Sequence, residues 1–430
     1  MSTTGLLDTV RELAVGLLDA AAVPVLLYFA VINTSYLLTV VLAAVEVHSQ
    51  KNRGSAGLAG VGGAPVPGVS VIVPAHNEQE GVVTAVKALL TLRYPRHEVV
   101  VVDDGSTDAT LSRLTEAFDL VPIPRAVPQD VPVHATVHQV LVPRDGHTRL
   151  VVVSKDNSGK TEAVNTGVNA ATEPLVAIID ADSVLEPDAL LRVARPFSDD
   201  PTRTVATGGS IRPVNGSRIQ AGRVTQVRAP RPWLSRFQLV EYLRAFLLGR
   251  AGWSRLGCLV LISGAFGLFR RDLVVEVGGL DRHSIGEDFE LIVRLHRHLR
   301  DQGRDYRLAF IAEPVAWTEV PESPAVLGRQ RRRWHRGLWE TLWGVPGHAP
   351  APALRTDRAP RPALCLGLRA LRPLPRSTGP GGGRGRPRRR HGRRPVLPDV
   401  PDRRLRLCDL RRTVCHGSGR VGLPPVRALA

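Results

Sequence analysis

The sequence predicts an α/β fold with a mostly parallel sheet, joined to an N-terminal membrane helix. Short continuous apolar runs are typical of strands buried on both faces, and helical spacing of apolar residues separates them. Carboxylates directly follow two of these runs, and an apolar stretch of membrane-spanning length precedes them all. Together, these observations predict a membrane helix followed by an α/β domain.

Residues 1–50 are predicted to form a membrane anchor. Residues 23–45 are apolar and uncharged, and about 20 such residues are enough to cross a bilayer. Lys51 and Arg53 follow the run, which predicts that the rest of the chain lies on the cytoplasmic face of the cell membrane. The alternative is a buried helix of a soluble protein.

Residues 51–68, rich in Gly, Ala and Pro, are predicted to be a linker, and residues 69–343 a single domain. The strands expected in this domain are 69–74, 98–102, 150–153, 175–179, 203–208 and 307–312, and the expected helices are 78–92, 235–248, 287–299 and 324–343. Strands alternating with helices predict a sheet covered on both faces, in which ligands bind at the carboxyl ends of the strands.

Residues 344–430 are predicted to be a disordered basic tail. From residue 345 onward the chain has no Phe, Tyr, Trp or Lys, and it holds 20 of the 57 Lys+Arg and 4 of the 40 Asp+Glu. Because the net charge of +17 is concentrated there, it gives no reason to expect nucleic-acid binding by the domain. The abrupt change after a well-patterned helix also supports the hypothesis of a frameshifted C-terminus.

Asp180 and Asp182 follow the strand expected at 175–179 and are predicted to bind a divalent metal ion. Carboxylate oxygens suit Mg²⁺ or Mn²⁺, which would bridge to the phosphates of a nucleotide. The alternative for this common triplet is a simple turn or helix cap.

Asp103 and Asp104 follow the strand expected at 98–102, and one carboxylate is predicted to contact a nucleobase or a ribose. A capped strand-to-helix turn is the alternative. Glu78 is predicted to contact the same base. Lys160 does not belong to a P-loop, because that motif requires Gly where residue 154 is Ser, but its charge can still serve a diphosphate.

Glu287 and Asp288 open the helix expected at 287–299. Asp288 is predicted to be a general base that takes a proton from an acceptor hydroxyl as this oxygen attacks an anomeric carbon and inverts it. The alternative is that both acids only complement the helix dipole.

Gln330, Arg333 and Trp334 share one face of the helix expected at 324–343. The indole offers a flat surface for a sugar ring, and the guanidinium can pair with phosphate. A basic amphipathic helix at a lipid surface is the alternative.

The order and spacing of these motifs resemble the processive glycosyltransferases of family 2: the cellulose, chitin, hyaluronan and poly-N-acetylglucosamine synthases. The resemblance covers about residues 69–343 and implies a GT-A (Rossmann-like) fold, a UDP-sugar donor and Mg²⁺ or Mn²⁺. It also implies the roles of individual residues: uridine binding by Asp103 and Asp104, metal binding by Asp182, catalysis by Asp288, diphosphate and acceptor binding by Gln330, Arg333 and Trp334, and an acceptor pocket lined by Ser263 and Gly264.

The resemblance further implies a membrane-bound, inverting hexosyltransferase that adds sugar from UDP-N-acetylglucosamine or UDP-glucose to a growing polysaccharide, with no nucleic-acid partner. It leaves open a membrane partner subunit. The family continues into further transmembrane helices, whereas residues 344–430 contain no apolar run of that length. Two alternatives stay open: a transferase that adds one sugar to a lipid or another acceptor, and a non-catalytic basic protein that binds membranes through its tail.

Overall fold

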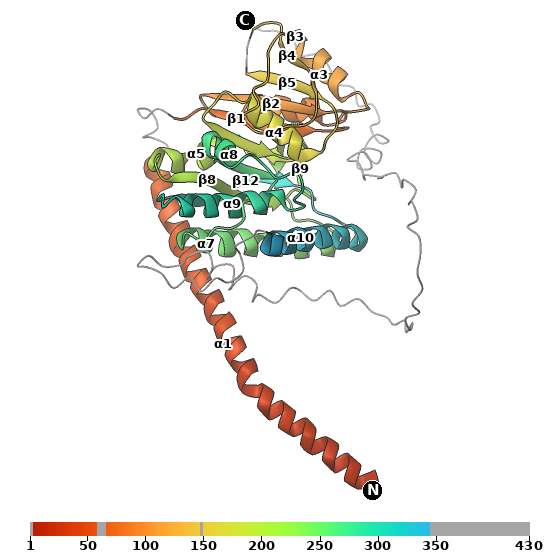
Figure 1. The fold of residues 1–430 in the computed structure, drawn as a ribbon, viewed down its shortest axis with the longest axis vertical. Coiled ribbons are helices and arrows are strands. Elements are labelled where there is room, and N and C mark those ends of the chain that lie inside the picture. Colours follow the sequence, from red (N-terminus) through yellow and green to blue (C-terminus); the bar gives the residue numbers. More distant parts are fainter. Residues whose placement is uncertain (1–2, 58–65, 147–148, 345–430) are drawn as a thin grey trace, which may run out of the picture. The chain divides into compact units, whose positions relative to one another are not determined.

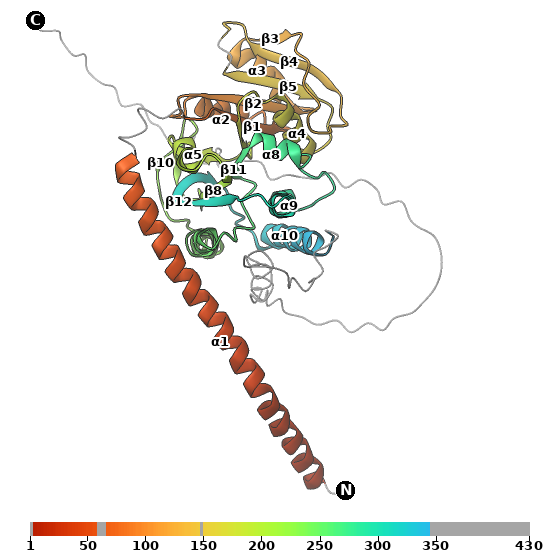
Figure 2. The ribbon, with the colours of Figure 1, turned by 60° about the vertical axis from the view of Figure 1, so that its left-hand side comes forward.

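In the computed structural model, residues 3–57, 66–146 and 149–344 are described, and they form a mixed ten-stranded sheet flanked by helices (Figures 1 and 2). The strands of this sheet are β1 (Val69–Ala75), β2 (His97–Asp104), β3 (Leu120–Ile123), β4 (Val137–Pro143), β5 (Leu150–Lys155), β6 (Leu175–Ile179), β7 (Val184–Leu185), β8 (Thr204–Pro213), β11 (Phe266–Arg270) and β12 (Arg307–Thr318). Strands β9 (Arg218–Gln220) and β10 (Arg223–Gln226) form a separate hairpin.

The helices are α1 (Thr3–Gly57), α2 (Val82–Leu90), α3 (Thr110–Phe118), α4 (Lys160–Ala170), α5 (Ala189–Asp199), α6 (Trp233–Leu243), the π-helix η1 (Arg244–Arg250), α7 (Ala251–Arg255), α8 (Arg271–Glu276), α9 (Glu287–Asp301) and α10 (Pro324–Gly344). They include counterparts of the four expected in the domain, together with α3, α4, α5, α7 and α8, which sequence patterns did not predict.

The strand order is β3-β4-β5-β2-β1-β6-β11-β8-β12-β7. The central strands β5, β2, β1 and β6 are parallel to one another, whereas β11 runs antiparallel between β6 and β8. The carboxyl ends of the four central strands therefore meet at one edge, and the amino end of β11 reaches the same edge. All of the expected strands are present, so the predicted α/β class is confirmed.

Strand β2 shows why the central strands read as continuous apolar runs. Val99 and Val101 belong to the main hydrophobic core, while Val100 and Val102 belong to a second cluster with residues of β4, β5 and α4. Successive side chains of a strand point to opposite faces, so both faces of β2 are buried. The sequence prediction of a sheet covered on both sides is confirmed here.

The strands that sequence patterns did not predict are mainly the antiparallel ones. Strand β11 has only five residues and contains Gly267, and β4 pairs with β3 and β5 at one margin of the sheet. Short segments of this kind carry little periodicity. Their pairing depends on residues distant in the sequence, which only the folded chain brings together.

The helix expected at 235–248 is divided, which corrects the sequence prediction. Helix α6 is followed by η1, in which each turn of the backbone is wider than in an α-helix. Within η1 the Arg250 guanidinium lies 3.8 Å from the centre of the Phe246 ring. This cation–π contact lies within the wider turn. The 3.6-residue apolar periodicity of the sequence does not predict the π-helix.

Helix α1 contains a stretch, Arg11–Asn52, that is long and apolar enough to cross a membrane, and an 18-residue window within it has a mean hydropathy of 2.2. The span expected at 23–45 lies within it, and most of its large apolar side chains are exposed. The Gln50 amide donates to the Phe310 carbonyl at 2.6 Å and accepts from the Ala312 N–H at 3.0 Å. The C-terminal part of α1 is thereby attached to β12.

Two predicted segments lie partly or wholly outside the described residues. Helix α1 continues to Gly57, so the first residues of the expected linker 51–68 are helical. The side chains of His48 and Asn52, four residues apart, hydrogen-bond on this helix at 3.0 Å. Residues 58–65 of the linker lie outside the described part, as do residues 345–430 of the expected tail 344–430.

Helix α4 crosses β1 so closely that only glycine fits at position 167. A Cβ atom there would lie 2.3 Å from Cγ2 of Ile72. We expect Gly167→Ala to destabilise the protein by about 1–3 kcal/mol through overpacking. This loss occurs although alanine favours a helix over glycine by up to about 1 kcal/mol.

Gly328→Ala is the matched control, because Gly328 is also helical and no atom lies within 4 Å of its Cβ position. We expect this variant to be neutral or slightly more stable. Urea unfolding of the detergent-solubilised chain measures both effects. Equal midpoints for the two variants would contradict the close packing of α4 on β1.

Candidate functional site

The site lies at the edge where the parallel strands end. Ala75 of β1 is paired with Asp103 of β2, and Asp104 is paired with Lys155 of β5. Ile179, the last residue of β6, is paired with Phe266 at the start of β11. The residues that follow these strands, including Asp180, and the residues that precede β11, including Gly264, therefore lie at one edge.

Asp104 is buried at the end of β2. Its carboxylate pairs with the ammonium group of Lys155, which is fully buried. It also accepts the backbone N–H groups of Ser158 at 3.0 Å and Gly159 at 2.8 Å. Asp104 thus holds the loop between β5 and α4, and this engagement makes it less available to a nucleotide than the sequence suggests.

Asp103 is also buried, but its contacts are weaker. It accepts the Ser106 N–H at 3.3 Å and the Ser154 hydroxyl at 3.5 Å. Next to it, His76 Nδ1 lies 2.8 Å from the Asp104 carbonyl oxygen, and the N–H of Glu78 donates to the Thr110 hydroxyl at 2.9 Å. The backbone after β1 is thereby placed beside the end of β2.

Lys155 is a site residue that the sequence reading missed. A lysine is rarely buried without a partner, so its position at the end of the apolar strand β5 was the available signal. The Lys155 ammonium also donates to the Ser158 hydroxyl at 2.6 Å. The pair of Lys155 and Asp104 joins the ends of two neighbouring strands, and the two residues are 51 positions apart in the sequence.

Lys160 connects two of the acidic motifs. Its ammonium lies 2.5 Å from Asp180 Oδ1 and 3.5 Å from Glu287 Oε1. Burial alone lowers the pKa of Lys160, but the charges of Asp180, Glu287 and Asp288 outweigh it and raise the pKa above its ordinary value. Lys160 therefore remains positively charged among three carboxylates.

Asp182 lies in an environment that disfavours its negative charge. Burial raises the pKa of Asp182, and the nearby charge of Asp180 raises it further. A cation between the two carboxylates would relieve this repulsion, and their oxygen ligands suit a hard divalent ion. Within the described part of the chain, no group of three or more His, Cys, Asp or Glu side chains could hold a metal ion. The two carboxylates Asp180 and Asp182 fit a hard divalent ion whose other ligands would come from phosphate and water.

Asp288 is held against the segment that precedes β11. Its Oδ2 atom accepts the Gly264 N–H at 3.0 Å, and Oδ1 accepts the Phe289 N–H at 2.8 Å. A Cβ on residue 264 would lie 3.5 Å from Oδ2. Ser263 and Gly264, which the family resemblance places in an acceptor pocket, are thus adjacent to the expected base.

Helix α10 packs directly on the turn that carries Glu287 and Asp288. A Cβ on Gly337 would lie 2.8 Å from the Gly286 backbone nitrogen, so the two backbones touch. Leu338 and Leu342 of α10 pack against Phe289 and Val293 of α9. This close approach places the Gln330–Trp334 segment in a fixed position relative to the acidic turn.

The three predicted residues of α10 have different surroundings. The Gln330 Oε1 atom is buried and has no hydrogen-bond partner among the described residues. Arg333 is exposed, and Trp334 is 40% exposed with the Arg331 guanidinium 4.7 Å from its ring centre. Arg331, which the sequence reading passed over, pairs with Glu241 of α6 at 2.5 Å and anchors this part of α10.

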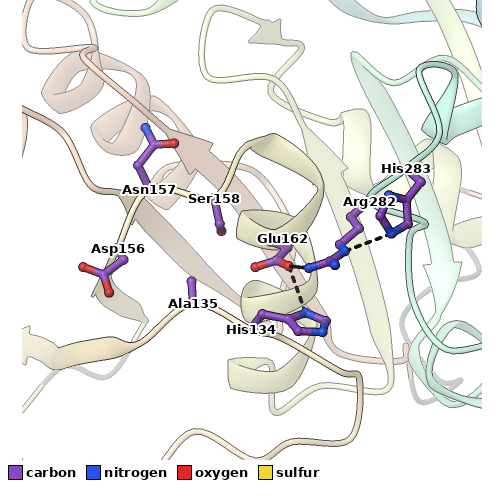
Figure 3. Close-up of a pocket in the computed structure, with 8 residues that line it drawn as sticks. All are labelled: His134, Ala135, Asp156, Asn157, Ser158, Glu162, Arg282 and His283. Carbon is purple, nitrogen blue, oxygen red and sulfur yellow. Dashed lines mark hydrogen bonds and ion pairs between the residues drawn. The ribbon is translucent and has the colours of Figure 1, made fainter.

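A shallow pocket of about 400 Å³ opens beside the β5–α4 loop. Figure 3 shows its lining residues, which come from the loop before β4, the β5–α4 loop, α4 and the loop before α9: His134, Ala135, Asp156, Asn157, Ser158, Glu162, Arg282 and His283. No sequence motif indicated this pocket, because its residues come from segments far apart in the chain.

A family model described as "Glycosyltransferase like family 2" matches residues 67–337, which is more than half of the chain. Poly-beta-1,6-N-acetyl-D-glucosamine synthases of Staphylococcus epidermidis and Staphylococcus aureus (strain COL) are each 26% identical over 277 residues, 64% of this chain. These matches span 56% and 55% of the two relatives, so the chain covers little more than half of their length.

Two solved structures are also similar. The mannosyltransferase PcManGT of Pyrobaculum calidifontis, in complex with GDP-Man and Mn²⁺, is 21% identical with a TM-score of 0.46, covering 78% of this chain and 80% of that one. S. aureus TarS in complex with UDP-GlcNAc is 17% identical with a TM-score of 0.38, covering 60% and 59%.

The buried pair of Lys155 and Asp104 makes a prediction about stability. Lys155→Met leaves a buried carboxylate without its counter-ion, and we expect a loss of about 3–5 kcal/mol in the free energy of unfolding. Adding Asp104→Leu should recover part of that loss, because the second change removes the unpaired charge. Lys87→Met, at an exposed position of α2, is the control and should change stability by less than about 0.5 kcal/mol.

Denaturant unfolding of the four proteins provides the measurement. If Lys155→Met is as stable as the control, the pair does not hold the β5–α4 loop.

Proposed function

The chain belongs to glycosyltransferase-like family 2, and on that premise we propose that it is a membrane-bound, inverting hexosyltransferase that extends a polysaccharide with sugar from a UDP-sugar. The observation that carries the proposal is the Lys160 ammonium between Asp180 and Glu287. Lys160 thereby joins Asp180, which would face a diphosphate, to the first turn of α9, which holds the expected base Asp288. UDP-N-acetylglucosamine is the first donor to test, because the curated relatives are named for that sugar, and UDP-glucose is the second.

The nucleotide is proposed to bind across the ends of β1, β2 and β6. Asp103 is the better candidate for the base or ribose, since Asp104 is engaged by Lys155 and two backbone N–H groups. Glu78 lies after β1 at the same edge, and Lys160 supplies positive charge for the diphosphate. Ligands bind at this edge in sheets of this class.

Asp180 and Asp182 are proposed to hold Mg²⁺ or Mn²⁺ together with the diphosphate oxygens. An ion bound there supplies a Lewis acid that stabilises the charge developing on the leaving diphosphate. The protein's own contribution is a pair of oxygen ligands at the end of β6. Before an ion and a diphosphate bind, Lys160 balances part of the negative charge of these carboxylates.

Asp288 is proposed to be the general base. Two backbone N–H groups hold its oxygens, and Gly264 leaves space in front of it. An acceptor hydroxyl bound against Ser263 and Gly264 would give its proton to Asp288 while its oxygen bonds to the anomeric carbon. The bond from that carbon to the diphosphate oxygen breaks on the opposite side, which inverts the configuration.

Helix α10 is proposed to bind the acceptor end of the reaction. Trp334 is exposed enough to stack on a sugar ring, and Arg333 is free to reach phosphate in solvent. Gln330 Oε1 is buried and finds no partner in the described part of the chain, so a ligand hydroxyl that donates to it would satisfy it. Helix α1 is proposed as the membrane anchor, with Lys51 and Arg53 on the cytoplasmic side.

We expect Asp182→Asn to lower the rate of sugar transfer roughly 10²-fold or more, because it removes a metal ligand that stabilises the leaving group. EDTA should inactivate the wild type, and added Mn²⁺ or Mg²⁺ should restore it. The assay follows UDP release from UDP-N-acetylglucosamine by the membrane-embedded chain. Asp199→Asn, on the outer surface of α5, is the control. A metal-independent wild type would exclude the assignment.

Asp288→Asn should retain affinity for UDP but lower transfer by roughly 10² or more, since only the proton acceptor is removed. Calorimetric titration with UDP and Mn²⁺ measures the first property, and initial rates measure the second. Loss of UDP affinity in this variant would instead show that Asp288 belongs to the nucleotide site.

A further inference from the structure

Helix α4 holds the loop that leads to the acidic turn at two points. The Asn165 side chain donates to the Leu280 carbonyl at 2.9 Å and accepts the Leu280 N–H at 2.8 Å. One turn earlier, Glu162 Oε1 accepts from the Arg282 guanidinium at 3.3 Å. Leu280 and Arg282 precede Glu287 by only seven and five residues. The same helix therefore carries Lys160 and fixes the path of the chain to the expected base.

Glu162 is a buried charge at the centre of this arrangement. Only 3% of its surface is exposed, and its Oε1 atom also lies 3.1 Å from His134 Nδ1. Burial alone raises the pKa of Glu162, but hydrogen bonds from Ser158, Arg282 and His134 outweigh this effect and lower the pKa below its ordinary value. Glu162 is thus a carboxylate near neutral pH.

The Glu162 carboxylate lies between the Ser158 loop and Arg282 (Figure 3). The second carboxylate oxygen of Glu162, Oε2, is buried and accepts no hydrogen bond from the described residues. Ser158 nevertheless helps to lower the pKa of Glu162. A buried, incompletely bonded carboxylate costs stability, and an apolar residue of similar size would commonly avoid that cost. Stability alone therefore does not explain why a glutamate occupies position 162.

On its other side, Glu162 is tied to the end of β2 through the start of α4. The backbone N–H groups of Ser158 and Gly159, which lead into α4, donate to the Asp104 carboxylate at 3.0 Å and 2.8 Å, and the Ser158 hydroxyl accepts from the Lys155 ammonium at 2.6 Å. Glu162 lies in the first turn of this helix and accepts from Arg282 at 3.3 Å. The start of α4 therefore connects the edge proposed to bind the nucleoside with the loop that leads to Glu287 and Asp288.

We propose that Glu162 is a positioning residue that, through Arg282, couples the nucleoside end of the site to the placement of Asp288. This inference rests on the proposed function. The carboxylate holds the loop in the geometry required for proton transfer and touches neither donor nor acceptor. A shift of about 1 Å in such a group can reduce turnover roughly 10²-fold. Loss of Glu162 should therefore lower kcat while leaving donor binding nearly unchanged.

The test compares Glu162→Gln and Glu162→Ala with the wild type, using the full chain in lipid nanodiscs and UDP-N-acetylglucosamine as donor. We expect kcat to fall roughly 10- to 100-fold and KM for the donor to change by less than about 3-fold. Arg282→Ala should show the same pattern. The double variant Glu162→Ala/Arg282→Ala should be little worse than either single variant, because both remove one interaction.

His134→Gln is the matched control, since His134 contacts the same Glu162 oxygen from a segment that does not lead to Asp288. Its kcat should stay within about 2-fold of the wild type if only the Arg282 contact positions the base. Melting temperatures of all variants identify any that fail to fold. In that case Glu162→Gln, which keeps the side-chain volume, decides the outcome.

Amide hydrogen exchange of residues 280–288 separates failure of this inference from failure of the proposed function. Exchange there should be faster in Glu162→Gln than in the wild type or His134→Gln, even without donor, because the loop loses one of its two attachments to α4. If wild type does not turn over any UDP-sugar, the proposed function fails, and exchange still decides whether Glu162 holds the loop. Unchanged exchange, unchanged kcat or an equal loss in His134→Gln would each overturn the role of Glu162.

Discussion

The site depends on neutralising carboxylates that the topology concentrates at one edge of the sheet. The acidic residues at the ends of parallel strands would repel one another, and several of them are instead paired with a cation from a neighbouring segment. Lys155 pairs with Asp104, Lys160 lies between Asp180 and Glu287, and Arg282 meets Glu162. Asp182 is not among these pairs, and its raised pKa marks the place where additional positive charge would be favourable.

These cations also determine how the segments are joined. Lys160 and Glu162 are two residues apart on α4, yet one faces the end of β6 and the other faces the loop before α9. Helix α4 itself is fixed on β1 by the close approach of Gly167 to Ile72. A rigid element packed on the centre of the sheet thus holds both the diphosphate side and the base side of the proposed reaction, which is the support that precise catalytic geometry requires.

The acceptor side is held by a different kind of contact. Helix α10 touches the acidic turn backbone to backbone, through Gly337 and Gly286, and Arg331 attaches it to Glu241 of α6. Helix α1 is attached to the edge of β12 by the Gln50 amide and to α7 by the pair of Glu46 and Arg255. The apolar helix, the proposed acceptor helix and the sheet are therefore linked through specific polar contacts as well as through apolar packing.

The sequence by itself determined the fold class, the central strands and the acidic residues at their ends, because burial on both faces imposes a continuous apolar pattern that chain-local periodicity reveals. Apolar spacing likewise indicated α9, α10 and the long apolar helix. The tertiary structure alone decided that Asp104 is engaged by Lys155, that Glu162 meets Arg282 and that Gly337 touches Gly286. It also decided the antiparallel insertion of β11, which places Gly264 beside Asp288. These contacts join residues 24 to 120 positions apart, and local patterns carry no information about which distant group will satisfy a buried charge or fill the space beside a backbone.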